Sequence, residues 1–169
     1  MARVIIEFMQ EHYRFLTFWV TQNVVNVTPD QLLYVPLNGR NHIYWTFGHM
    51  TAHMDMGPVL VPGAADTLSP AYQQLFGKGT LPVPNGAGYP PFEDMQSEFR
   101  RLGKLAVKCI GQLQDADLTQ PPARPMPAEL QSMFPNQGAI IRGNSFHMAY
   151  HNGQLSQFKA MFERRHQER

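Results

Sequence analysis

The chain has 169 residues, of which 43% are hydrophobic and 16% are charged, as expected for a globular domain with a substantial core. Fourteen Lys and Arg against thirteen Asp and Glu leave a net charge of +1, which excludes the broad basic excess needed to bind nucleic-acid phosphates. The lone cysteine, Cys109, excludes an intrachain disulfide, and no apolar run approaches the roughly 20 residues of a membrane-spanning helix. We therefore expect one cytoplasmic domain, residues 1–169, without nucleic-acid or membrane partners.

The first expected element is a helix over residues 3–24. Its spacing of apolar residues predicts one buried stripe, formed by Ile5, Phe8, Met9, Phe15, Leu16 and Trp19. His12 falls on this stripe, where it can either line a pocket or be a hydrogen-bonded core histidine. Glu7 and Glu11 interrupt the apolar run, so it does not resemble a signal peptide.

The next elements are a short helix and the second long one. Thr28 and Pro29 suit the cap and first position of the short helix, and residues 37–40 read as a loop. The second long helix is expected over residues 41–56, with Asn41 as its cap and Gly57 and Pro58 as its stop. One face of it carries Trp45, His49, Ala52, His53 and Met56, whereas His42 is expected at the surface.

A long connection rich in Pro and Gly follows over residues 57–90, with one short helix expected at 69–76, where Ser69 can serve as the cap. Such a connection is either a functional lid or a plain crossover. The third long helix is expected over residues 91–113, and a second Pro-rich connection comes after it. The stripe of the third helix consists of Phe92, Met95, Phe99, Leu102, Ala106, Cys109 and Leu113.

The fourth long helix is expected over residues 136–166. Its inner face is predicted to carry Ile140, His147, His151, Gln154, Leu155, Phe158 and Phe162. No run of alternating strand residues and no repeat appears in the sequence. Four amphipathic helices and two long connections predict an all-α fold, a four-helix bundle with long crossover connections.

Two histidines of the fourth helix stand where its stripe would otherwise place Leu or Phe. His147 and His151 are four residues apart, which brings the Cβ atoms of two helical residues to about 5–6 Å. Two ring nitrogens can then share one ion at about 2.0–2.1 Å, or the two can be unrelated core histidines. Burial of an imidazole without a partner is unfavourable, and His49 of the second helix supplies a third candidate ligand.

A family resemblance rests on these residues. The motif Trp45-Thr-Phe-Gly-His49-Met, followed about a hundred residues later by His147-Met-Ala-Tyr-His151-Asn-Gly-Gln, resembles the DinB/YfiT-like metalloenzyme superfamily. The segment from Thr28 to Pro36 is also similar to the stretch between the first two helices of that family. The resemblance covers nearly the whole chain. It implies a four-helix bundle that holds a divalent ion, often zinc or nickel, through His49, His147 and His151.

The surroundings of this triad differ from the family in one place. Many members carry Arg after the last histidine, where this chain has Asn152, which would remove or alter any contact of that Arg with a substrate or a partner subunit. Gln154 is kept and can either orient a ligand or close the helix packing. His53 can be a fourth ligand, a neighbour of the ligands, or a hydrogen-bonded core histidine.

Three neutral imidazoles leave an ion with open positions, as in catalytic sites. Such an ion can activate water or hold a thiol as thiolate, and the resemblance points to thiols because some relatives are transferases or isomerases that use bacillithiol or mycothiol. We therefore predict a thiol S-transferase that joins a small thiol to an electrophile, with no catalytic residue assigned. Trp45, Phe146 and Tyr150 are expected to wall its pocket. The alternatives are a non-catalytic metal-binding stress protein, possible as a homodimer, and a metal-dependent hydrolase with Asp55 or Glu163 as base.

Overall fold

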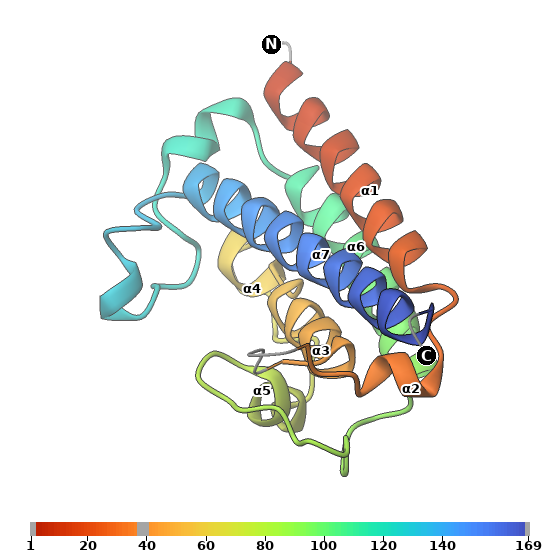
Figure 1. Cartoon of the computed structure of the whole chain (residues 1–169). Coiled ribbons are helices and arrows are strands. Elements are labelled where there is room, and N and C mark those ends of the chain that lie inside the picture. Colours follow the sequence, from red (N-terminus) through yellow and green to blue (C-terminus); the bar gives the residue numbers. More distant parts are fainter. Residues whose placement is uncertain (1–2, 37–40, 168–169) are drawn as a thin grey trace.

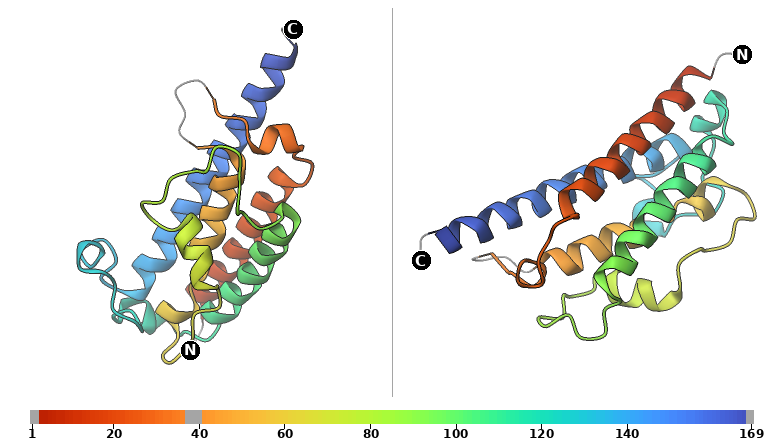
Figure 2. Two further views of the ribbon diagram at one scale, coloured as in Figure 1. Left: turned by 90° about the horizontal axis from the view of Figure 1, so that it is seen from below. Right: turned by 90° about the vertical axis from the view of Figure 1, so that its right-hand side faces the viewer.

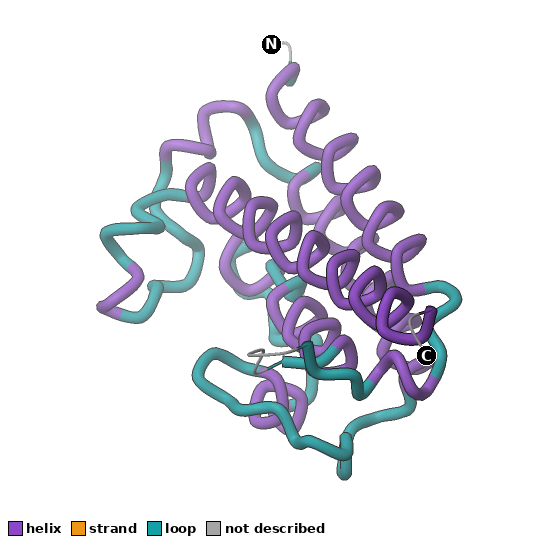
Figure 3. The backbone as a smooth tube through the Cα atoms, viewed as in Figure 1, coloured by secondary structure: helices purple, strands orange, loops and turns teal. Residues whose placement is uncertain are grey.

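The computed structural model describes residues 3–36 and 41–167, so the loop expected at residues 37–40 lies outside the described part. The described residues form helices and loops and contain no strand, which confirms the all-α prediction (Figures 1 and 3). The elements in chain order are α1 (Val4–Val24), α2 (Pro29–Leu32), α3 (Ile43–His53), α4 (Gly57–Leu60), α5 (Pro70–Phe76), α6 (Phe92–Ile110), η1 (Asp115–Thr119), η2 (Ala128–Leu130) and α7 (Gln137–Gln167).

The four long helices, α1, α3, α6 and α7, make the bundle (Figure 2). Hydrogen bonds from Tyr13 to Asn144 and from Asn23 to Asn152 show that α1 and α7 run parallel. Bonds from Gln10 to Val107 and from Gln96 to Val24 show that α6 runs antiparallel to α1. Helix α3 packs against α6 and α7, so its inner face meets the middle of α7.

The buried stripe of α1 differs from the one predicted. Leu16 is buried and Met9 packs against the core, but Phe8 and Phe15 are 66% and 62% exposed, and Ile5 and Trp19 are also exposed. The helix instead buries a neighbouring face, formed by Ile6, Tyr13, Leu16, Val20 and Val24. Because α1 carries apolar residues on two faces, its periodicity alone did not identify the one that meets α6 and α7.

The start of α3 corrects two predictions. His42, and not Asn41, is the cap, and its Nδ1 accepts a hydrogen bond of 3.1 Å from the backbone N–H of Trp45. The His42 side chain is fully buried, where a surface position was expected, because its Nε2 also bonds the carbonyl of Val83. The end of α3 comes earlier than expected, at His53, and Gly57 and Pro58 begin α4 instead of only stopping α3.

The remaining predicted elements agree with the structure in type and place. Thr28 and Gln31 form the reciprocal cap of α2. Helix α6 ends at Ile110, three residues earlier than expected, and it buries the predicted stripe up to Cys109, with the partly buried Phe92 packed against the same core. Leu113 is also buried, but it lies beyond the end of the helix. Helix α5 begins after Ser69, although the Ser69 side chain makes no capping hydrogen bond. Within residues 3–36 and 41–167, none of the helices is both long and apolar enough to cross a membrane.

Candidate metal centre

The three predicted histidines come together where α3 crosses α7. Nε2 of His147 lies 3.1 Å from Nε2 of His49 and 3.1 Å from Nε2 of His151. The donor atoms of all three rings lie within 4.8 Å of one another. Two nitrogens bound tetrahedrally to one ion at about 2.05 Å would be about 3.3 Å apart, so the spacing suits a shared ion.

His49 is oriented by the end of α5, which lies in the connection expected to be either a functional lid or a plain crossover. Its Nδ1–H donates a hydrogen bond of 2.7 Å to the carbonyl of Phe76, the last residue of α5. The fully buried Phe76 ring lies against Gly48, where a Cβ would come within 2.4 Å of it. The absence of a side chain at Gly48 therefore allows the end of α5 to approach α3 and fix the ring of His49. Trp45 stacks on the other side, at a ring distance of 4.9 Å.

His151 is oriented from within its own helix. Its Nδ1–H donates a hydrogen bond of 2.7 Å to Oε1 of Gln154, one turn further along α7. The amide nitrogen of Gln154 in turn donates to the hydroxyl of Tyr150 at 3.3 Å. Of the two readings of Gln154 from the sequence, the structure shows the one in which it positions a candidate ligand.

These hydrogen bonds determine which ring nitrogens carry a proton and which present a lone pair at the centre of the triad. Because Nδ1 carries the proton in His49 and in His151, the Nε2 atom of each ring presents a lone pair to His147. A neutral His147 has one N–H, which can serve only one of the two lone pairs, and its own Nδ1 is buried without a partner. A cation at the centre would satisfy three lone pairs at once, so the residues fit a divalent ion.

The electrostatics also favour neutral imidazoles, the form that binds metal. Burial lowers the pKa of His147 to about 3, with further lowering by the nearby charges of His53, His151 and His49. Burial, followed by the influence of His49 and His151, lowers the pKa of His53 to about 4. The pKa values of His49 and His151 are lowered as well, mainly by burial.

We expect the metal-free protein to lose stability in mild acid. The pKa of histidine in the unfolded chain is about 6.5. Below that pH His53 and His147 bind protons in the unfolded chain but stay neutral in the folded protein, because their folded pKa values are lower. Each such proton lowers the free energy of unfolding by at most about 1.4 kcal/mol per pH unit. Urea unfolding in the presence of a chelator should therefore show a constant midpoint above pH 7 and a falling midpoint between pH 6.5 and about pH 4. A midpoint that stays constant over that range would contradict this account.

His53 lies beside the triad without belonging to it. Its ring centre is 4.5 Å from that of His49 and 4.6 Å from that of His147. Its donor atoms are not among those that converge within 4.8 Å, and its Nε2 is buried without a hydrogen-bond partner. This geometry makes it a neighbour of the three ligands that can face a molecule bound next to them.

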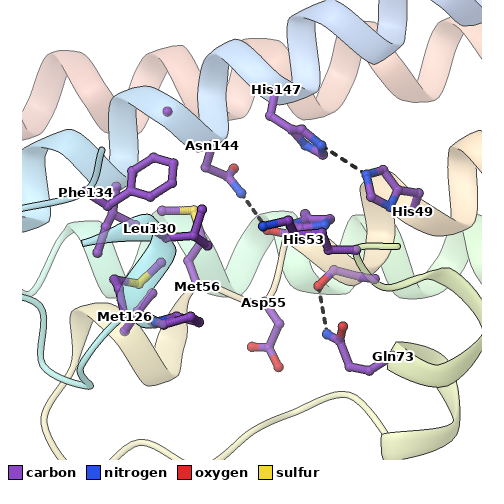
Figure 4. Close-up of a pocket in the computed structure, with 16 residues that line it drawn as sticks. His49, His53, Asp55, Met56, Gln73, Met126, Leu130, Phe134, Asn144 and His147 are labelled. Atoms are coloured by element: carbon purple, nitrogen blue, oxygen red, sulfur yellow. Dashed lines mark hydrogen bonds between the residues drawn. The ribbon is translucent and has the colours of Figure 1, made fainter. Parts of the chain in front are cut away.

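A cavity of about 610 Å³ opens beside His49, His53 and His147 (Figure 4). Part of its remaining wall comes from the two long connections, which contribute Lys78, Met126, Leu130 and Phe134. Residue composition gave no indication of them, because these residues reach the site only through the path of their loops.

Two predictions about the pocket need correction. Phe146 and Tyr150 are 73% and 57% exposed, and they line a separate depression of about 440 Å³ on the outer side of α7, which His147 also borders. Trp45 stacks on the ring of His49 but does not line the cavity. Of the two readings of His12, the structure favours the hydrogen-bonded histidine, since its Nε2 bonds Ser145 at the contact between α1 and α7 and it does not line the cavity.

Asn152, which stands in place of the frequent family Arg, faces away from the cavity. It is fully buried, and its side-chain and backbone oxygens accept hydrogen bonds of 3.0 and 3.1 Å from the amide of Asn23 on α1. Its role in this chain is therefore to join α1 to α7.

The fold and the site together define a class of helical-bundle proteins. In this class one histidine of the second long helix and two histidines of the last long helix meet at one point. Comparison with known families agrees with this class. The profile of the DinB superfamily matches residues 20–155, so the chain belongs to the DinB superfamily. No curated protein matches the sequence significantly.

Removal of the Gln154 amide should weaken metal binding without abolishing it. In Gln154→Ala the Nδ1–H of His151 loses its acceptor, and loss of such an orienting partner typically lowers metal affinity about 10- to 100-fold. Competition with a chromogenic chelator would measure the change. The control is Gln157→Ala, an exposed glutamine of the same helix, which should bind metal like the unmodified protein. Equal affinities for the two variants would exclude the orienting role.

Proposed function

We propose that this protein is a divalent-metal-dependent enzyme that transfers a low-molecular-weight thiol to an electrophile. The observation that carries the proposal is the convergence of Nε2 of His49, His147 and His151 at the wall of the cavity. Three imidazoles leave room for a further ligand, and they suit zinc and nickel alike. A divalent ion there would lower the pKa of a thiol and so supply the reactive thiolate.

The chain's own residues have defined tasks in this proposal. Phe76 and Gln154 hold two rings with Nε2 directed at the centre. The cavity, of about 610 Å³, has room for the electrophile beside the sulfur. In the reaction the sulfur forms a bond to the electrophilic carbon, the leaving group departs with its electron pair, and the thiol proton passes to solvent.

Metal-dependent hydrolysis receives less support because neither Asp55 nor Glu163 is placed as a base. Oδ2 of Asp55 accepts hydrogen bonds of 2.8 and 3.2 Å from the backbone N–H groups of Thr67 and Leu68. Figure 4 shows the Asp55 carboxylate directed away from His147. Glu163 is exposed on α7, three turns beyond His151. A purely structural ion is also less well supported, since His53 does not join the three converging nitrogens.

The test is conjugation of a thiol to monochlorobimane by the metal-loaded protein. Bacillithiol, mycothiol and glutathione would be supplied in turn, and the fluorescence of the thioether product would be followed. We expect conjugation with at least one thiol, lost after chelation and restored by zinc or nickel. A rate that never exceeds the uncatalysed rate with any of these thiols would exclude thiol transfer to this electrophile.

We also propose a homodimer, which the outer face of α1 supports. Phe8, Phe15 and Phe18 are 66%, 62% and 61% exposed on one helix, and aromatic residues are enriched in protein interfaces. The net charge of +1 imposes little repulsion between two copies. Light scattering should give the mass of a dimer for the unmodified protein and of a monomer for Phe15→Glu. The control Leu81→Glu, at a 74% exposed site elsewhere, should stay dimeric, and a monomeric unmodified protein would contradict the proposal.

A further inference from the structure

The cavity beside the triad has two chemically different ends. Figure 4 shows His49 and His147 on one side and Met126, Leu130 and Phe134 grouped on the other. The second end, here called the apolar arm, is formed by Met56, Val59, Met126, Leu130, Phe134 and Ile140. These residues come from α3–α4, from the segment before α7 and from α7 itself.

Two backbone hydrogen bonds anchor the segment that forms the outer wall of the apolar arm. The backbone N–H of Ala123 donates to the carbonyl of Val59 at 2.9 Å, and that of Gln137 donates to the carbonyl of Gln120 at 3.0 Å. Between these two anchors the chain passes outward through η2. Lys78 and Glu129 approach within 3.8 Å and link the segment after α5 to η2.

A close approach to α7 fixes the far side of the arm. A Cβ on Gly143 would come within 2.3 Å of the Phe134 ring, so an edge of the ring lies directly against the helix at Gly143. This contact places Phe134 one turn from His147 and directs the arm toward the candidate ligands. Two of the arm's residues are methionines, whose flexible side chains adapt to guests of different shape.

We propose that the apolar arm binds a hydrocarbon tail of the substrate whose reactive head lies at the three histidines. The inference rests on the proposed function for the position of the head, but the arm itself exists without an ion. Half-buried apolar residues around an open cavity gain free energy when a hydrocarbon displaces the water there. Leu130 and Met126 then determine how long or wide a tail is accepted.

The first experiment measures chain-length dependence with straight alkanethiols, from ethanethiol to octanethiol, on the cobalt-loaded protein. Binding is read from the cobalt–thiolate absorption band. We expect affinity to rise about fourfold per methylene, the factor that corresponds to about 0.8 kcal/mol, until the arm is full. In Leu130→Trp, whose indole occupies the arm, the dependence should disappear while ethanethiol still binds. The control Leu81→Trp, outside the cavity, should behave like the unmodified protein.

A second measurement needs no ion and separates this inference from the proposed function. The uncharged dye N-phenyl-1-naphthylamine should bind and fluoresce with the unmodified protein and with metal-free His147→Ala, but not with Leu130→Trp. Should Leu130→Trp fail to fold, as judged by circular dichroism, Met126→Trp takes its place. The inference is overturned if the affinity for alkanethiols does not depend on their chain length. It is also overturned if the Leu130→Trp protein binds the dye as well as the unmodified protein does. If no thiolate band appears but dye binding is lost in Leu130→Trp, the apolar arm is supported as a binding site. Only the proposed thiol chemistry is then refuted.

Discussion

His151→Ala should leave the protein with almost no bound metal. The substitution removes one of three converging nitrogens and leaves His49 and His147 on opposite helices. Loss of an orienting partner alone typically lowers metal affinity about 10- to 100-fold, so we expect the loss of a ligand itself to exceed about 100-fold. Elemental analysis of the freshly purified protein should give close to one equivalent of zinc or nickel for the unmodified chain and a trace for the variant.

The matched control for that experiment is another histidine of the same helix. His166 is exposed and bonds only the carbonyl of Phe162, so His166→Ala should retain its full metal content. Thermal unfolding would supply a second readout, because an ion that binds only the folded chain raises its melting temperature. Equal metal content in His151→Ala and the unmodified protein would refute the ligand assignment.

Gly48→Ala should damage both stability and metal binding. The added Cβ would lie 2.4 Å from the ring of Phe76, which is fully buried. Overpacking of this kind destabilises a protein by about 1–3 kcal/mol. Displacement of Phe76 would also remove the carbonyl that holds Nδ1 of His49. We therefore expect a lower urea midpoint and, in the fraction that remains folded, weaker metal binding in a chelator competition.

Gly153→Ala is the control with the opposite expectation. Gly153 lies two residues after His151, inside α7, and nothing is within 4 Å of the place its Cβ would occupy. Alanine in a helix interior is more favourable than glycine by about 1 kcal/mol, so this variant should be slightly more stable and bind metal normally. A Gly48→Ala protein as stable as the Gly153→Ala protein would show that the close contact with Phe76 is not limiting.

The sequence predicted the helices and the closeness of His147 to His151 because both depend on short-range spacing, and it predicted the family and the place of His49 through a motif. Four amphipathic segments determine a bundle, and the four-residue step from His147 to His151 puts both rings on one face of a helix. His49 could be paired with them because its helix carries it on the apolar face, within a motif that resembles the family's.

The remaining features depend on contacts between distant segments. Phe15 and Leu16 are neighbours with similar hydropathy, and only the positions of α6 and α7 decide that Leu16 is buried and Phe15 is exposed. His42 looked like a surface residue because histidine is an uncommon cap. No pattern of side chains indicates that the backbone carbonyl of Phe76 accepts a hydrogen bond from His49. Part of the cavity wall depends on the path of two Pro-rich connections.

The pairing of His49 with His147 spans 98 positions of the chain. An ion bound to both rings would close a loop of that length, as a disulfide does. This chain has a single cysteine and so has no intrachain disulfide to do the same. Without metal, α3 and α7 are held together at this crossing by side-chain packing, by the contact of His49 with His147 and by the hydrogen bond from Asn144 to the carbonyl of His53. The lifetime of the protein against cellular proteases would then depend on metal supply, so that cells starved of the ion would degrade the empty form first.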